Sequence, residues 1–262
     1  MEKKVLIIED DLIDQMAIKR LFKKKTIPYP YTLVSSIKDA KRELSEQEFH
    51  LVISDHNLAD GTTFDLLDDL KNIPLILITG NQETATVASV LENSNAIASF
   101  TKDLDFKYLE ELPNLIQQNL DQIDLTKTPR NNIFTKSKSL TLKQDNVTID
   151  LSIIFKIFDE KKDDIKETIE LFIYNKPREM NDLYQSLHLK NCDTVVKISH
   201  RMKSGFRILG MKNQEQLATF IEKAVGDSIE KCSCPKVGNA FKQLSTDTKI
   251  AIELLQKELP LL

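Results

Sequence analysis

The sequence predicts two domains: an α/β domain built on a doubly wound parallel sheet, followed by an all-α four-helix bundle. Three observations support this prediction. In the first 120 residues, short apolar runs alternate with amphipathic stretches of helical period, which indicates a parallel sheet with helices on both faces. Residues 121–146 are rich in Thr, Lys, Ser and Asn and have no sustained period. From residue 149 onward, apolar residues have helical spacing and no strand pattern is convincing.

The first domain, residues 1–120, is expected to contain five strands, each a short apolar run. They are at residues 5–8, 31–34, 51–53, 75–78 and 97–100. The first run, VLII, is continuously apolar, as a strand covered on both faces should be. Helical patterns follow the strands, at residues 13–21, 37–46, 63–70, 84–91 and 106–120.

The second domain is expected to cover residues 147–262, after a flexible linker at residues 121–146 that contains Pro129. A short helical pattern at residues 153–158 precedes four longer ones, at residues 165–187, 193–209, 214–225 and 237–259. Short connections between them indicate antiparallel neighbours in a bundle. Pro177 lies inside the first long pattern, where it should bend or break the helix.

Charge and hydropathy exclude several classes of protein. The net charge of −4 argues against an extended nucleic-acid surface. The N-terminus has no apolar stretch of the kind found in signal peptides, and no uncharged apolar run approaches the ~18 residues that span a bilayer. We therefore expect a cytoplasmic protein that neither binds nucleic acid nor inserts into a membrane.

Polar residues that suit phosphoryl chemistry follow four of the predicted strands. Glu9 and Asp10 follow the first strand, Asp55 the third, Thr79 the fourth and Lys102 the fifth. In an open α/β sheet, ligands bind outside the carboxyl ends of the strands, and neighbouring strands lie about 5 Å apart, so these side chains should converge. A single Asp after a strand is more often a turn residue or helix cap; the whole set in this order favours a site.

The chemistry expected of this set is phosphoryl transfer to Asp55. Several carboxylates in one site repel each other unless a cation neutralises them, and Mg²⁺ prefers such oxygen ligands. Asp55 could then attack a phosphoryl donor as a carboxylate nucleophile. The metal and the Lys102 ammonium would stabilise the negative charge of the transition state, and the Thr79 hydroxyl could bind a phosphoryl oxygen.

In the second domain, His200 departs from the apolar pattern of its predicted helix. The apolar residues of that helix are spaced 3, 4, 4 and 3 and form one stripe, made of Val195, Ile198, Met202, Phe206 and Leu209. His200 points roughly opposite, and Lys203 and Arg207 share its face. A lone histidine is more often a structural residue. Gly205 costs about 1 kcal/mol relative to Ala in mid-helix and is expected where another backbone or a close helix approaches.

The segments VLIIEDD, LVISDHNLADG, LILITG and SFTKD resemble the response-regulator receiver domain of two-component signalling, over about residues 3–120. The resemblance implies a five-stranded flavodoxin-like fold that catalyses its own phosphorylation from a phosphohistidine. It implies these roles by position: Asp55 as phosphoacceptor, Glu9 and Asp10 as the acidic pair that holds Mg²⁺, the backbone carbonyl of Asn57 as a further metal ligand, Thr79 as the switch hydroxyl and Lys102 as the lysine. Asp103 stands where the family usually has proline.

The segment ISHRMKSGFRILGM resembles the histidine-containing phosphotransfer domain, with a likeness over about residues 147–259. That resemblance implies a four-helix bundle with an exposed, phosphorylatable histidine. His200 matches this histidine, and Lys203 matches the lysine that supports the phosphoryl group. Ser204 and Gly205 reverse the Gly-Ser order that is commoner in the family.

Together these features predict a phosphorelay protein that passes phosphoryl groups between Asp55, His200 and partner proteins. The expected partners are a sensor histidine kinase and other receiver-domain proteins, because we find no ATP-binding motif and no DNA-binding output domain. Two alternatives stay open. One is a non-catalytic adaptor whose receiver docks partner proteins, and the other is a phosphate sink in which His200 drains a receiver.

Overall fold

The chain divides into two compact units, Met1–Ile133 and Phe134–Leu262. The computed structural model describes residues 2–23, 27–70, 72–80, 85–102, 108–121, 140–226 and 234–262. Within these ranges, no helix combines the length and the apolar character needed to cross a membrane.

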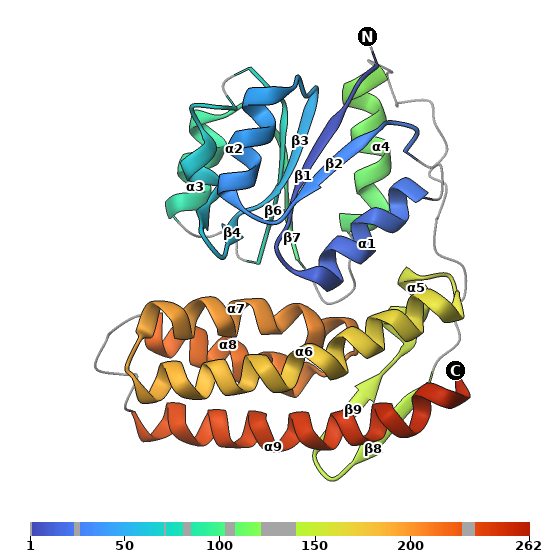
Figure 1. The fold of residues 1–262 in the computed structure, drawn as a ribbon, viewed down its shortest axis with the longest axis vertical. Coiled ribbons are helices and arrows are strands. Elements are labelled where there is room, and N and C mark those ends of the chain that lie inside the picture. Colours follow the sequence, from blue (N-terminus) through green and yellow to red (C-terminus); the bar gives the residue numbers. More distant parts are fainter. Residues whose placement is uncertain are drawn as a thin grey trace. The chain divides into compact units, whose positions relative to one another are not determined.

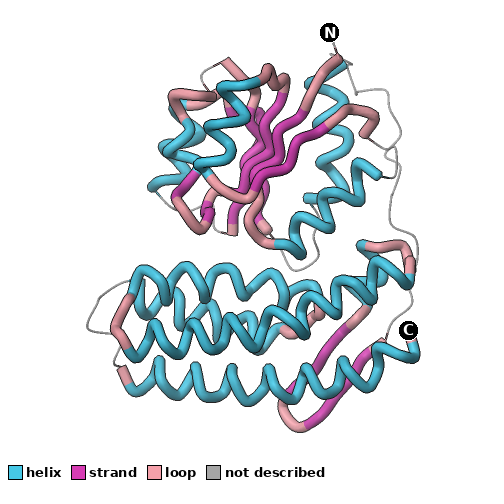
Figure 2. Tube along the Cα trace, viewed as in Figure 1, coloured by secondary structure: helices cyan, strands magenta, loops and turns pink. Residues whose placement is uncertain are grey.

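A five-stranded parallel sheet lies at the centre of the N-terminal unit (Figures 1 and 2). Its strands are β1 (Val5–Ile8), β2 (Tyr31–Val34), β3 (Leu51–Asp55), β6 (Leu75–Thr79) and β7 (Ala96–Thr101). They are ordered β2-β1-β3-β6-β7, and every pair is parallel. This is the flavodoxin-like order of a doubly wound sheet, so the predicted five-stranded parallel sheet is confirmed.

Helices cover both faces of the sheet, which explains why its central strands are buried along their whole length. In Figure 1, α1 (Leu12–Lys23) and α4 (Tyr108–Asp121) cover one face, and α2 (Ile37–Glu46) and α3 (Ala85–Asn93) cover the other. Alternate strand residues point to opposite faces. Leu6, Ile8 and Val52 therefore share one core with residues of α2 and α3.

The predicted helix over residues 63–70 is present only as the 3₁₀ helix η1 (Thr63–Leu66), followed by turns to Leu70. Before it lie β4 (Asn57–Leu58) and β5 (Gly61–Thr62), which pair antiparallel. The Thr63 hydroxyl donates a hydrogen bond of 2.8 Å to the backbone carbonyl of Asp55. This contact fixes the chain directly after the hairpin, and hydrogen-bonded turns then continue to Leu70 in place of a regular helix.

The turn between β4 and β5 also caps helix α2. The Asp60 carboxylate accepts hydrogen bonds from the N–H groups of Ile37 (2.9 Å) and Lys38 (3.0 Å). The Ser36 hydroxyl oxygen accepts from the N–H of Asp39 at 3.0 Å. The first N–H groups of a helix have no partner within the helix, so these bonds stabilise the start of α2 and attach the turn to it.

The C-terminal unit is helical, as predicted. Its helices are α5 (Ser152–Ile157), α6 (Lys162–His188), α7 (Cys192–Ile208), α8 (Lys212–Gly226) and α9 (Pro235–Glu258), followed by the 3₁₀ helix η4 (Leu259–Leu261). Helices α6 and α8 each pack against both α7 and α9. The predicted apolar stripe of α7 is buried at all its positions, and Phe172 meets Phe206 edge to face with ring centroids 5.9 Å apart. Helix α6 continues through Pro177, which is exposed.

A β-hairpin precedes these helices, where the sequence analysis placed the end of a linker and no strand. It consists of β8 (Thr141–Gln144) and β9 (Val147–Asp150). Val147 and Ile149 are buried and alternate with exposed or half-buried neighbours, and Asp145 occupies the turn with φ 51°. Residues 122–139 of the predicted linker, and the predicted helix starts at residues 84 and 106, lie outside the described residues.

Gly210 joins the hairpin to the end of helix α7. The N–H of Met211 bonds to the carbonyl of Phe206 (2.8 Å) and the N–H of Gly210 to that of Arg207 (2.9 Å), which closes the helix with Gly210 at φ 61°. The N–H of Asp150 bonds to the carbonyl of Leu209 at 2.9 Å. A Cβ atom at Gly210 would lie 2.7 Å from the Asp150 carbonyl oxygen.

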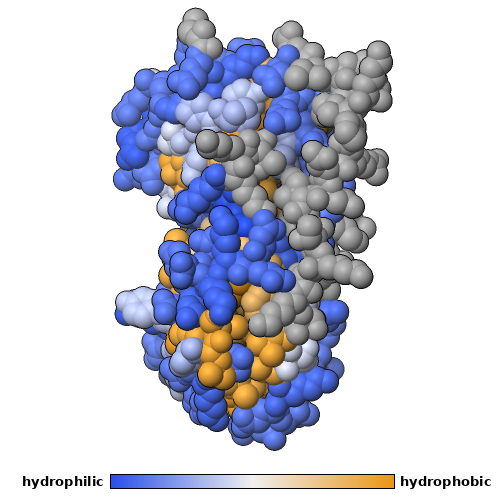
Figure 3. All heavy atoms as spheres, turned by 90° about the vertical axis from the view of Figure 1, so that its right-hand side faces the viewer, coloured by the Kyte–Doolittle hydropathy of each residue, from blue (hydrophilic) through white to orange (hydrophobic). Residues whose placement is uncertain are grey.

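Some large hydrophobic side chains of the C-terminal unit remain at its surface. Those exposed among its described residues are Tyr174, Tyr184, Leu189, Phe220 and Leu261. Figure 3 shows a wide hydrophobic area on one face of this unit.

We expect Gly210→Ala to destabilise the C-terminal unit by about 1–3 kcal/mol, because Ala is strained at this φ and its Cβ would meet the Asp150 backbone. The measurement is the free energy of opening of the slowest-exchanging amides of this unit.

The matched control is Gly238→Ala, in helix α9, where an added Cβ has no neighbour within 4 Å. This change should stabilise the unit by up to about 1 kcal/mol. Equal stability of the two variants would contradict the role assigned to Gly210.

Candidate functional site

The predicted site residues of the N-terminal unit lie at one edge of its sheet. Glu9 follows β1, Asp55 ends β3, Thr79 ends β6 and Lys102 follows β7, and these four strands are adjacent in the sheet. The N–H of Lys102 donates to the carbonyl of Thr79 at 2.8 Å, which keeps the chain in register one residue past β7. Thr79 is fully buried. These residues therefore lie together at the carboxyl ends of adjacent strands, as predicted.

The Lys102 ammonium lies among three buried carboxylates. Its Nζ is 2.6 Å from Asp55 Oδ2, 2.7 Å from Asp14 Oδ2 and 2.9 Å from Glu9 Oε2. The side chains of all four residues are at most 5% exposed. Charge-assisted hydrogen bonds of this length, shielded from water, are much stronger than surface ion pairs.

Besides its contact with Lys102, Asp55 accepts three further hydrogen bonds, from Asn57, Ser54 and Thr63. Its Oδ1 accepts a hydrogen bond from the N–H of Asn57 at 3.2 Å, and its backbone carbonyl accepts from the hydroxyl groups of Ser54 and Thr63, each at 2.8 Å. The N–H of His56 bonds to β6 at the carbonyl of Ile78 (2.9 Å). The carboxylate therefore has a fixed direction, toward the ends of the neighbouring strands.

Three carboxylates form a group that could hold a metal ion. Oxygens of Glu9, Asp10 and Asp55 lie within 4.8 Å of one another. Asp10 is oriented by the N–H of Ala59, which donates to its Oδ2 at 2.9 Å. An all-oxygen, anionic set of this kind suits a hard divalent cation.

The charges in this pocket change the proton affinities of its members. Burial raises the pKa of Glu9 well above its ordinary value, an effect that the Lys102 charge offsets only in part. Burial would lower the pKa of Lys102, but the negative charges of Asp14, Asp55 and Glu9 raise it well above its usual value. The lysine is therefore an ammonium, and the crowded carboxylates favour a cation.

Asp14 is a member of this pocket that the sequence analysis missed. It lies in the first turn of α1, is 0% exposed and is the closest charged residue to Lys102 after Asp55. A signal for it exists in the sequence, because Asp14, Ala17, Ile18 and Leu21 have the i, i+3, i+4, i+7 spacing of one buried helix face. A carboxylate on such a face needs a buried positive partner.

Residues 5–113 match the family model described as the response regulator receiver domain. The N-terminal unit is a response regulator receiver domain. The match lies within Met1–Ile133, and residues 134–262 are outside it. Asp103, where the receiver family usually has proline, lies outside the described residues.

Several solved receiver structures are similar to this chain. The signal receiver domain of an HD domain-containing protein from Pseudomonas fluorescens has a TM-score of 0.41 and 20% identity, over 47% of this chain and 97% of that chain. A CheY-like receiver from Methanospirillum hungatei has a TM-score of 0.39 and 17% identity, over 47% of this chain and 100% of that chain. The third is the receiver domain of a Pseudomonas aeruginosa sensor histidine kinase, which has a magnesium ion in its active-site cleft. Its TM-score is 0.40 and its identity 20%, over 46% of this chain and 99% of that chain. No curated protein matches the chain.

In the C-terminal unit, beyond the receiver, His200 of α7 faces helix α8. Its Nδ1 is 2.6 Å from Oε1 of Glu222, and the Lys203 ammonium is 2.7 Å from Oε2 of the same carboxylate. The side chain of His200 is 20% exposed, so it is less exposed than the resemblance implies. The reason is that α7 packs closely on α8. Lys203 shares the face of His200, as predicted.

Glu222 was not predicted from the sequence, although charges on α7 and α8 are matched. Glu222 and Glu215 are seven residues apart on α8, and they pair with Lys203 and Arg207, four residues apart on α7; the Arg207–Glu215 distance is 2.9 Å. Lys203 precedes Arg207 on α7, whereas its partner Glu222 follows Glu215 on α8, which is the order that antiparallel helices require. Comparing the charges of the two predicted helices could have shown these pairs.

The close approach predicted at Gly205 comes from α6 of the same unit. A Cβ at Gly205 would lie 2.5 Å from Cε of Lys176 and 3.2 Å from the ring of Phe172. Lys176 is 2% exposed, and its ammonium bonds to Glu179 Oε2 (2.6 Å) and to the carbonyl of Met202 (3.3 Å). Gly205 therefore makes room for a buried lysine beside the helix that carries His200.

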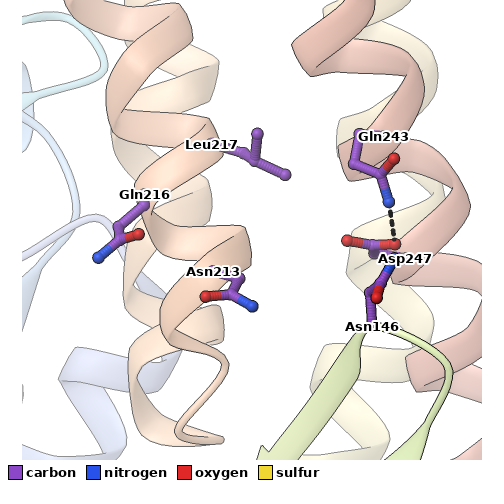
Figure 4. Close-up of a pocket in the computed structure, with 6 residues that line it drawn as sticks. All are labelled: Asn146, Asn213, Gln216, Leu217, Gln243 and Asp247. Atoms are coloured by element: carbon purple, nitrogen blue, oxygen red, sulfur yellow. Dashed lines mark hydrogen bonds between the residues drawn. The ribbon is translucent and has the colours of Figure 1, made fainter.

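A cavity of about 340 Å³ lies elsewhere in this unit, between the hairpin turn and helices α8 and α9 (Figure 4). It is lined by Asn146, Asn213, Gln216, Leu217, Gln243 and Asp247. The Asp247 carboxylate accepts hydrogen bonds from the amides of Gln214 (2.8 Å) and Gln243 (2.6 Å). None of the predicted site residues lines this cavity, and its side chains include no nucleophile beyond a carboxylate that is already bonded.

Glu222 makes the stability of the C-terminal unit depend on pH. Burial raises the pKa of Glu222, but the hydrogen bond and charge of His200 and those of Lys203 outweigh it and hold the pKa below the ordinary 4.5. A carboxyl whose folded-state pKa is lowered stabilises the fold above its unfolded pKa and loses that contribution as the pH falls through the folded pKa.

Accordingly, Glu222→Gln should destabilise the unit by about 1–2 kcal/mol at neutral pH. The difference from wild type should shrink as the pH falls below 4.5. Urea titrations followed through the NMR signals of α7 and α8 amides measure this difference. A difference that is the same at low and neutral pH would contradict the pairing.

Proposed function

We propose that this chain is a phosphorelay protein in which Asp55 accepts phosphoryl groups and His200 carries them to or from a partner. The receiver domain itself implies two-component phosphorelay signalling. The observation that carries the proposal is the contact of 2.6 Å between the Asp55 carboxylate and the Lys102 ammonium, inside a buried acidic pocket. The expected partners are a sensor histidine kinase and other receiver-domain proteins.

Mg²⁺ is the cation that we propose for the three-carboxylate group. Glu9, Asp10 and Asp55 would hold it, with the backbone carbonyl of Asn57 as a further ligand. The similar P. aeruginosa receiver, which has magnesium in its active-site cleft, supports this choice. When bound, the ion would neutralise the carboxylates and the phosphoryl oxygens.

The protein's own residues would then direct the transfer. An oxygen of Asp55 forms a bond to phosphorus while the N–P bond of the donor phosphohistidine breaks, and the leaving imidazole takes up a proton. The Lys102 ammonium lies where it can bind a phosphoryl oxygen, and the Thr79 hydroxyl, at the end of the next strand, can bind another. Such donors stabilise the charge that spreads over the phosphoryl oxygens.

His200 is proposed as the second phosphoacceptor, in a four-helix phosphotransfer bundle made of α6 to α9. If Nδ1–H donates to Glu222, the lone pair of Nε2 is available to form an N–P bond while the P–O bond of a donor aspartyl phosphate breaks and its carboxylate leaves. Lys203 lies beside it and would support the phosphoryl charge. This arrangement of nucleophile, orienting carboxylate and ammonium supports a chemical role beyond that of a packed histidine.

The domain organisation that we propose is a receiver over residues 1–120, a linker from residue 121 and a phosphotransfer domain that ends at residue 262. We place the start of the second domain at about residue 141 instead of residue 147, because β8 of the hairpin begins there.

An adaptor function is the second candidate, because one observation favours it. The hydrophobic area that Figure 3 shows on the C-terminal unit would offer a surface for a partner protein without any phosphoryl chemistry. In a third alternative, His200 is a phosphate sink that drains a receiver, and its chemistry is the same as that of a relay because phosphoryl transfer is reversible.

Incubation of the full chain with Mg²⁺ and acetyl phosphate tests the proposal. We expect phosphate on Asp55 that Asp55→Ala abolishes, and acid-labile phosphate on His200 that His200→Gln abolishes, both located by mass spectrometry. If His200 is loaded from Asp55, Asp55→Ala also removes the label from His200.

The controls are Asp69→Ala and His188→Gln, which change exposed residues of the same types and should leave labelling intact. Absence of label on Asp55 with any donor, including kinases, would overturn the receiver function. Labelled Asp55 with a His200 that stays inert toward a panel of receivers would leave a single-domain switch.

The orienting role of Glu222 has its own signature. Glu222→Ala should slow phosphoryl transfer to His200 about tenfold, because the imidazole loses its fixed direction, while Glu222→Gln keeps an acceptor for Nδ1–H and should lose less. ¹⁵N NMR of the His200 ring should show the tautomer with the proton on Nε2 rise in Glu222→Ala. An unchanged tautomer ratio in that variant would contradict this role.

A further inference from the structure

Asp14 is a buried carboxylate whose role the predicted chemistry does not include. It is 0% exposed in the first turn of α1, and its position is fixed by Asp11, whose Oδ1 accepts the N–H groups of Ile13 (2.8 Å) and Asp14 (3.1 Å). The Gln15 side chain donates to the carbonyl of Glu9 at 2.6 Å, which ties the same turn to the end of β1. Burying a carboxylate costs free energy, so a buried carboxylate on a backbone fixed by these hydrogen bonds indicates a specific role for Asp14.

The Lys102 ammonium has no spare donor in this structure. An ammonium has three N–H groups, and Glu9, Asp14 and Asp55 each lie within 2.9 Å of Nζ. A phosphoryl oxygen that reaches Lys102 must therefore replace one of these carboxylates.

Asp14 differs from the other two because it is outside the metal group. Glu9 and Asp55 belong to the cluster of carboxylates that could hold a cation, and Asp14 does not. A cation held by that cluster would engage Glu9 and Asp55, both of which contact Lys102 here, whereas Asp14 is outside the cluster. Asp14 would then be the carboxylate that stays with Lys102.

We propose that Asp14 is a positioning residue, which holds the Lys102 ammonium beside Asp55 while Glu9 and Asp55 engage the cation and the incoming phosphoryl group. This inference rests on the proposed phosphorylation of Asp55. Asp14 also adds a fourth carboxyl group to a pocket that has one ammonium, which increases the need for a cation there.

The test compares Asp14→Ala with Asp14→Asn in the full chain. Both remove one charge and should weaken Mg²⁺ binding alike, measured by calorimetry. At saturating Mg²⁺, Asp14→Ala should slow labelling of Asp55 by acetyl phosphate about tenfold, because the ammonium loses its direction. Asp14→Asn keeps an oxygen that can accept from Lys102 and should lose less. Glu48→Ala, which removes an exposed carboxylate of the same unit, is the control for charge.

A double-mutant cycle shows whether Asp14 acts through Lys102. In a Lys102→Ala background, Asp14→Ala should cause no further slowing. If Asp14→Ala does not fold, Asp14→Glu takes its place, since it keeps the charge and moves the carboxylate by one methylene group. That variant should slow labelling with little change in Mg²⁺ affinity.

Three results would overturn the inference: labelling of Asp14→Ala at the wild-type rate, equal slowing of Asp14→Ala and Asp14→Asn, or slowing that adds to that of Lys102→Ala. In each of them wild-type Asp55 is still labelled, so the proposed function stands. No labelling of the wild-type chain overturns the proposed function and this inference together.

Discussion

The contact of the Lys102 ammonium with three buried carboxylates determines much of how the receiver unit is built. A lysine at the end of the edge-most parallel strand reaches groups on β1, β3 and α1, with distances of 2.6–2.9 Å. Without the ammonium, these carboxylates would be buried charges of one sign in a small volume, and they would take up protons or move toward water. The carboxyl ends of strands β1, β3, β6 and β7 and the first turn of helix α1 therefore lie around one positive charge, the Lys102 ammonium.

The C-terminal unit has the opposite arrangement of charges, in which one carboxylate serves two nitrogen-bearing side chains. There one carboxylate, Glu222, is shared by His200 and Lys203, at 2.6 Å and 2.7 Å. The shared carboxylate orients the imidazole and at the same time balances the ammonium. In both units, the group proposed to take the phosphoryl group lies beside a lysine whose charge is already partnered. A phosphoryl group at either proposed site would therefore have to displace a carboxylate from the lysine.

The sheet and most of the receiver site could be predicted from the sequence because both depend on short-range patterns. Continuous apolar runs mark buried parallel strands, and the residues directly after those runs lie at one edge whatever the helices do. Asp14 and Glu222 were missed because their importance depends on a partner far away in the sequence, Lys102 in one unit and His200 in the other.

The errors have similar causes. The segment 63–70 has a helical pattern, but a hydrogen bond from Thr63 to the Asp55 carbonyl holds its start in a short turn. The hairpin at residues 141–150 was overlooked inside a polar stretch, although the alternation of Val147 and Ile149 on either side of Thr148 is a strand signal.

The turn between β4 and β5 gives the receiver pocket a link to its surroundings. Ala59 donates its N–H to Asp10, and the next residue, Asp60, accepts the first two N–H groups of α2 with its carboxylate. Two adjacent residues of this turn thus connect a member of the carboxylate group with the start of helix α2. The orientation of Asp10 and the start of α2 therefore depend on the same two-residue turn, so a substitution in that turn would disturb both.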